Sequence, residues 1–109
     1  MELRERYSAA QLETIIEEAS IYMCACPAQV VVAIRRLREL HHYQVGCISG
    51  PQAIPGVHER ILQSVIAAHA ELEQCLADIL AMENWDPVTF KMPEGLRMRR
   101  DEAIKSGDF

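Results

Sequence analysis

The clearest hydrophobic pattern in the chain covers residues 57–84. Its apolar positions recur every three or four residues, which predicts one long α-helix. They form two stripes: first Ile61, Val65, Ala68, Leu72, Cys75, Ile79 and Met82, and second Leu62, Ile66, His69, Leu76 and Leu80. The first stripe has the regular spacing of a coiled-coil seam. Because a helix with two apolar stripes buries both, we expect neighbours on two sides.

Two shorter helices are predicted before this one. Ser8 and Gln11 have the spacing of a capping box, and the apolar stripe that follows predicts a helix over 8–24. Pro27 fits the start of a second helix over 27–45, and we expect Gly46 to end that helix in the left-handed conformation. A single helix kinked at Pro27 is the alternative.

The predicted fold class is therefore all-α. The loop between the second and third helices contains two prolines and two glycines and must reverse the chain. We expect a small antiparallel bundle of three main helices, followed by a short C-terminal helical turn and tail, over about 8–24, 27–45 and 57–84.

The end of the chain has a weaker pattern. Asp86 followed by Pro87 predicts a single helical turn, and Trp85 and Phe90 are expected to anchor the segment on the bundle. We therefore predict one helical domain and a partly ordered tail, over residues 1–90 and 91–109.

Charge is distributed unevenly along a chain whose net charge is −5. Residues 27–47 contain three arginines and one glutamate, whereas residues 57–86 contain six carboxylates and one arginine, and residues 1–24 are also net acidic. This pattern favours packing the second helix between the first and the third. The acidic balance argues against a nucleic-acid partner, which selects a basic face. Because a chain this short buries a limited core, we expect self-association, most simply as a two-fold homodimer.

Other features bear on location and on class of activity. No stretch approaches the roughly 18 apolar residues of a membrane span, and the N-terminus lacks the apolar core of a signal peptide. We therefore expect no membrane partner and a cytoplasmic location, where the four cysteines stay reduced or bind a metal. The common nucleotide-binding, serine-hydrolase and HExxH motifs do not occur in the sequence, which favours a non-enzymatic role.

Three of the cysteines form the strongest candidate site. In an antiparallel hairpin, Cys26 begins the second helix, and Cys75 lies roughly 27 Å up the third, so both reach the same end. The first helix brings Cys24 to that end as well. Thiolates there suit zinc, cuprous copper or an iron–sulfur cluster, or thiol redox chemistry. The sequence thus predicts a metal-binding or thiol-redox protein; the alternative is a non-catalytic helical interaction module with buried structural cysteines.

Two weaker hypotheses use histidines. His42, Cys47 and His58 lie near the turn of the hairpin and are residue types that bind zinc. A ferritin-like di-iron bundle would use Glu39 and His42, which match the Glu-x-x-His pattern, together with His69 and Glu73. The expected heights of the two pairs differ, so this site needs a symmetry mate. Otherwise we expect His69 at the edge of the core and Glu73 in solvent.

Overall fold

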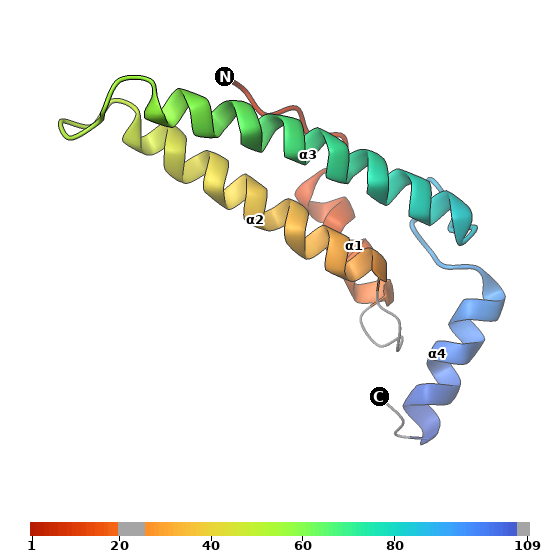
Figure 1. Cartoon of the computed structure of the whole chain (residues 1–109). Helices are drawn as coiled ribbons and strands as arrows, with labels where there is room; N and C mark the ends of the chain where they lie inside the picture. The colour runs from red at the N-terminus through yellow and green to blue at the C-terminus, as the bar shows by residue number, and fades with distance from the viewer. Residues whose placement is uncertain (20–25, 107–109) are drawn as a thin grey trace.

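The computed structural model describes residues 1–19 and 26–106 and contains four helices (Figure 1). They are α1 (Ala9–Ala19), α2 (Cys26–Cys47), α3 (Val57–Met82) and α4 (Glu94–Ser106). The described residues include no strand, and α2 packs against both α3 and α1. The predicted all-α bundle, with the second helix between the first and third, is therefore confirmed. None of the described helices combines the length and the apolarity needed to cross a membrane.

The start of α1 follows from its capping residues. The Ser8 amide donates to Gln11 Oε1 at 2.8 Å, and the Gln11 amide donates to Ser8 Oγ at 3.1 Å. These reciprocal bonds satisfy two amides that a helix start leaves without partners inside the helix. The predicted capping box is confirmed.

The α2–α3 hairpin is the longest feature of the fold, and its turn differs from the prediction in one respect. Gly46 was expected to end the second helix, but α2 continues to Cys47, because the Ile48 amide still donates to the Gln44 carbonyl at 3.1 Å. The left-handed glycine is Gly56, with φ 87°, immediately before α3. A side chain at Gly56 would be strained in that conformation.

The core lies where α1 and the start of the chain meet the hairpin. Its buried apolar side chains come from the start of the chain, from α1, α2 and α3, and from the segment after α3. They are Tyr7, Leu12, Ile15, Ala19, Val31, Ile34, Leu76, Leu80, Trp85, Phe90 and Met92. At the surface, Arg35 of α2 pairs with Glu13 of α1, and this contact lowers the pKa of the Glu13 carboxyl. The sign of this contact is the one that the charge pattern predicts.

The segment after α3 is anchored as expected. Trp85, Phe90 and Met92 are buried, and the Phe90 ring meets the Tyr7 ring edge-on at 5.9 Å between centroids. The Val88 and Thr89 amides donate to Asp86 Oδ1, which tightens this turn and lowers the pKa of Asp86.

The tail, which we predicted to be only partly ordered, contains a helix that was not predicted from the sequence. Residues Glu94–Ser106 form α4, which projects away from the bundle, as Figure 1 shows. Leu96, in its first turn, packs on the core. Because α4 has few apolar positions, its hydrophobic pattern gave no sign of a helix.

The two stripes of α3 have different environments. Leu62, His69, Leu76 and Leu80 of the second stripe are buried. In the first stripe Val65 is buried, but Ala68 is exposed and Met82 is 80% exposed. Leu72 and Ile79 of the first stripe pack on the core. The structure therefore covers the second stripe more fully than the first, which stays exposed at Ala68 and Met82.

Candidate functional site

A cluster of polar side chains, which we call the polar clamp, lies between α2 and α3. It consists of the partly buried Arg38 and the buried His69 and Glu73. The Arg38 Nε–H donates to His69 Nε2 at 3.0 Å, and Arg38 Nη2 donates to Glu73 Oε2 at 3.1 Å. His69 is 1% exposed and Glu73 is 4% exposed. An ion pair at this depth is stable only when its remaining polar atoms also find partners.

Those partners come from residues 1–7, which we call the strap. The backbone amides of Arg6 and Tyr7 donate to Glu73 Oε2 at 2.9 and 3.1 Å. In return, the Tyr7 carbonyl accepts a hydrogen bond from Arg38 Nη2 at 2.7 Å. The clamp therefore holds the strap, and through it the start of α1, on the hairpin.

The contacts of His69 define its protonation. Because Nε2 accepts a hydrogen bond from Arg38, the ring proton lies on Nδ1, which faces Glu73 Oε1 at 3.6 Å. Burial lowers the pKa of His69 below its ordinary 6.5, and the nearby Arg38 charge adds to that effect, although Glu73 opposes it. Burial also raises the pKa of Tyr7. The clamp thus contains a neutral histidine beside one ion pair.

The expectation that Glu73 is solvated is wrong, and Arg38 was not singled out from the sequence at all. Glu73 lies four residues after His69, so both side chains occupy the same face of α3. A carboxylate on a buried stripe needs a cationic partner, so the position of Glu73 could have predicted an arginine on a neighbouring helix. His69 was expected at the core edge and is fully inside.

The clamp also affects the di-iron hypothesis. Its guanidinium bonds to both His69 and Glu73, the two residues that would face a metal from α3. Glu39 is exposed on α2, and so is His42. A di-iron site would require these contacts to rearrange and a second copy to contribute ligands; it stays a prediction.

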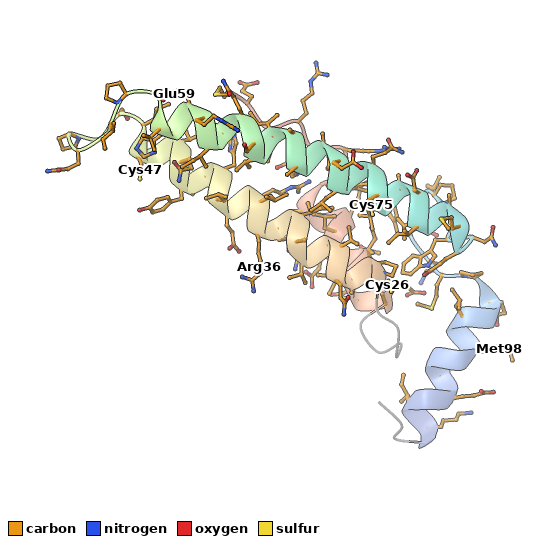
Figure 2. The ribbon with its side chains drawn as sticks, in the orientation of Figure 1. Cys26, Arg36, Cys47, Glu59, Cys75 and Met98 are labelled. Atoms are coloured by element: carbon orange, nitrogen blue, oxygen red, sulfur yellow. The ribbon has the colours of Figure 1, made fainter. Side chains whose placement is uncertain are left out.

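The three-thiol site is only partly visible. Cys24 lies outside the described residues. Cys26 is exposed at the start of α2, and Cys75 is a partly buried free thiol on α3. Both lie toward the end of the hairpin opposite the turn, as Figure 2 shows. The thiolate site therefore remains a prediction.

The second candidate set can be located completely. His42 is exposed, Cys47 is partly buried, and His58 Nδ1 is hydrogen-bonded to Gln44 Oε1 at 2.6 Å. Throughout residues 1–19 and 26–106, no group of three or more His, Cys, Asp or Glu side chains is placed to hold a metal ion. The structure therefore does not gather His42, Cys47 and His58 into one set of ligands.

A second surface feature is an apolar groove of about 450 Å³ along the α2–α3 hairpin. Its lining comes from α2 and α3 alone and consists of five apolar residues, one serine and one arginine: Leu37, Leu40, Ile61, Val65, Ala68, Ser64 and Arg60. We call it the open groove. Neither α1 nor the strap contributes to it, and both lie behind the hairpin in Figure 1.

Comparison with known proteins identifies no relative: no protein family, curated protein or solved structure matches this chain. The polar clamp and the open groove are therefore the features of this chain that bear on its function.

Proposed function

We propose that this protein is a non-catalytic helical interaction module that works as a two-fold homodimer, joined through the open groove. The observation that carries this proposal is an apolar groove lined only by α2 and α3, on the first stripe of α3. Grooves of this kind bind the apolar face of another helix. Free thiols at Cys47 and Cys75 suit a reducing compartment, and we include a cytoplasmic location in the proposal.

Charge complementarity favours a second copy as the occupant. α2 contains three arginines and one glutamate, whereas α3 contains four carboxylates and one arginine. A two-fold axis parallel to the helices would stack α2 of each copy on α3 of the other. Arg38 and Glu73 are already paired in the polar clamp, and Arg35 pairs with a glutamate of α1. The exposed Arg36 of α2 and Glu71 of α3 remain, and their opposite charges favour this pairing over one that stacks α2 on α2.

The register of the hairpin identifies a specific pair. His58 bonds to Gln44 near the turn, and His69 bonds to Arg38 further from it. Continuing this register places Arg36 level with Glu71. Both residues are exposed, and Arg36 points away from α3 in Figure 2. Since a parallel two-fold axis preserves height, Arg36 would meet Glu71 of the partner subunit.

The size of the face is sufficient for a stable dimer. α2 has 22 residues and α3 has 26, so the shared face is roughly 33 Å long and about 20 Å wide. Its projected area of roughly 660 Å² is close to the ~800 Å² per partner that stable interfaces bury. A dimer would also cover Leu40, which is 39% exposed in the single chain.

Light scattering on charge-reversal variants tests the proposal. We expect wild-type protein to have twice the 12.3 kDa chain mass. Arg36→Glu and Glu71→Arg should each weaken dimerisation about tenfold or more, because each puts like charges together, and the double variant should restore it.

Ala68→Glu places a charge in the groove and should give a folded monomer. Glu39→Lys, which reverses an exposed charge without a predicted partner, is the control and should remain dimeric. A wild-type chain that stays monomeric at about 100 µM would contradict the proposal, and so would a double variant no stronger than the single ones.

A further inference from the structure

We propose that a pocket between the strap and the turn end of the hairpin binds a small organic cation, an amine with a short hydrocarbon portion. The pocket, which we call the strap pocket, has a volume of about 670 Å³, within the range of small-molecule sites. It shares no lining residue with the open groove. The inference therefore does not depend on dimerisation.

Glu59 supplies the main observation. It lies in the first turn of α3 and lines the pocket, near the turn of the hairpin in Figure 2. Its Oε2 is the one buried side-chain nitrogen or oxygen without a hydrogen-bond partner among the described side chains. A buried carboxylate oxygen without a donor is unfavourable. Because the terminal torsion of glutamate is soft, this carboxylate can turn an oxygen toward a donor in the pocket.

The remaining charges of the pocket determine the sign of the ligand. Glu2, Glu5 and Glu59 line the pocket, and its positive groups are Arg38 and the N-terminal ammonium of Met1. Arg38 lies 3.8 Å from Glu5 but also bonds to Glu73 outside the pocket, so it does not neutralise the lining carboxylates fully. His41 Nε2 lies 3.0 Å from the Met1 carbonyl, which can only accept, so this nitrogen donates its proton there. The excess charge of the pocket is negative, which favours a cation over an anion.

The walls indicate the rest of the ligand. Apolar side chains from the strap, from α2 and its end, and from α3 line the pocket: Leu3, Val45, Ile48 and Leu62. A hydrocarbon chain would pack against them while an ammonium group donates to Glu59. This combination of an apolar wall and one unpaired acceptor is typical of a site that fixes a ligand by a single charged group.

Calorimetric titration with n-hexylammonium chloride tests the proposal directly. We expect saturable binding of one cation per chain. n-Hexyltrimethylammonium has the same charge but no N–H donor, and 1-hexanol has no charge; both should bind about tenfold more weakly, since each loses the charged hydrogen bond.

Variants identify the residue responsible. Glu59→Gln should weaken n-hexylammonium binding about tenfold, and Glu39→Gln, which removes one negative charge from α2 outside the pocket, should leave it unchanged. Circular dichroism checks that each variant is folded. If Glu59→Gln does not fold, Glu5→Gln on the strap takes its place, with an expected loss of about threefold. Absence of saturable binding, equal binding of amine and alcohol, or equal loss in the Glu39→Gln control would overturn the proposal.

Discussion

The two faces of the α2–α3 hairpin differ in what they contact. The closed face, under α1 and the strap, contains the polar clamp, which holds the strap by three specific hydrogen bonds. The open face contains a mainly apolar groove whose lining also includes Ser64 and Arg60. The closed face therefore specifies one arrangement of its own chain, whereas the open face is suited to a surface that the chain does not itself provide.

This difference has a physical basis. Buried charges are tolerated only with complete hydrogen bonding, so a strap held by them has little freedom to shift. Apolar contacts are not directional and depend mainly on the area removed from water. Substitutions on the closed face should therefore reduce stability of the fold, and substitutions on the open face should reduce association.

The largest effect is expected from Glu73→Ala on the closed face. It removes the buried carboxylate partner of Arg38, which keeps only the longer 3.8 Å contact to Glu5, and it removes the acceptor for two strap amides. We expect a loss of about 3–5 kcal/mol in the free energy of unfolding, measured by urea denaturation. Glu39→Ala, at an exposed position of α2, should change it by less than about 0.5 kcal/mol. Similar losses in both variants would refute the structural role of the clamp.

A matched pair of leucines sharpens the comparison. Leu62 is 1% exposed and Leu40 is 39% exposed. Leu62→Ala should destabilise the monomer by about 2–5 kcal/mol through cavity formation. Leu40→Ala should leave the monomer within about 1 kcal/mol of wild type but weaken the dimer. Both are measured by denaturation in the Ala68→Glu background and by sedimentation without it. Equal destabilisation would mean that the open face is part of the monomer core.

A smaller effect is expected at the start of α1. Ser8→Ala removes the hydroxyl that accepts from the Gln11 amide. The expected loss is about 1 kcal/mol in the free energy of unfolding. Thr14→Ala removes a hydroxyl on the same helix that bonds only to the Ala10 carbonyl, and it serves as the control. If Ser8→Ala lowers the free energy of unfolding no more than Thr14→Ala does, the capping box does not stabilise the fold.

The clamp also predicts a pH dependence. In the folded protein the pKa of His69 lies below 6.5, so between that pKa and 6.5 the unfolded chain binds more protons. Stability contributed by neutral His69 is present above pH 6.5 and is lost as the pH falls below it. His69→Gln keeps an acceptor for Arg38 but cannot titrate. On acidification the stability of this variant should decline less steeply than that of wild type, and the two slopes should differ by up to about 1.4 kcal/mol per pH unit. Parallel stability–pH curves for the two proteins would exclude this contribution.

The smallest effect is expected at Cys75, which is partly buried on the first stripe of α3. If this thiol is only a small apolar side chain, Cys75→Ala should change the stability of the monomer by about 1 kcal/mol or less. The thiolate hypothesis predicts a different result: stoichiometric metal in anaerobically purified protein, lost in Cys24→Ser, Cys26→Ser and Cys75→Ser alike. Elemental analysis of wild type and the three serine variants distinguishes a thiolate metal site from a Cys75 that is only an apolar side chain.

The fold was predictable where the pattern was local. The capping box at Ser8 and the long helix over α3 follow from spacing within one segment. The position of α2 between acidic neighbours follows from comparing the charges of three segments. α4 was missed because it has few apolar positions. The left-handed conformation was predicted for Gly46, but Gly56 adopts it. A glycine alone does not show which one adopts the left-handed conformation.

The candidate sites were less predictable because they join distant segments. The bond from Tyr7 to Glu73 spans 66 residues, and no local spacing indicates that the strap returns to α3. The open groove was present in the sequence as the first stripe of α3. Which of the two stripes the chain covers depends on the packing of α1 and the strap, and that packing was visible only in the structure.

The proposed dimer joins two parallel copies through the open face, and a distance measurement tests this arrangement. Spin labels are attached at Gln52→Cys, in the turn, with the native cysteines replaced by alanine. Parallel packing brings the two turns together and predicts a separation of roughly 20–30 Å. The molecule is 55 Å long, so antiparallel copies would give a distance well above that range, and a monomer would give no defined distance. A distance well above that range, or no defined distance, would rule out the parallel dimer.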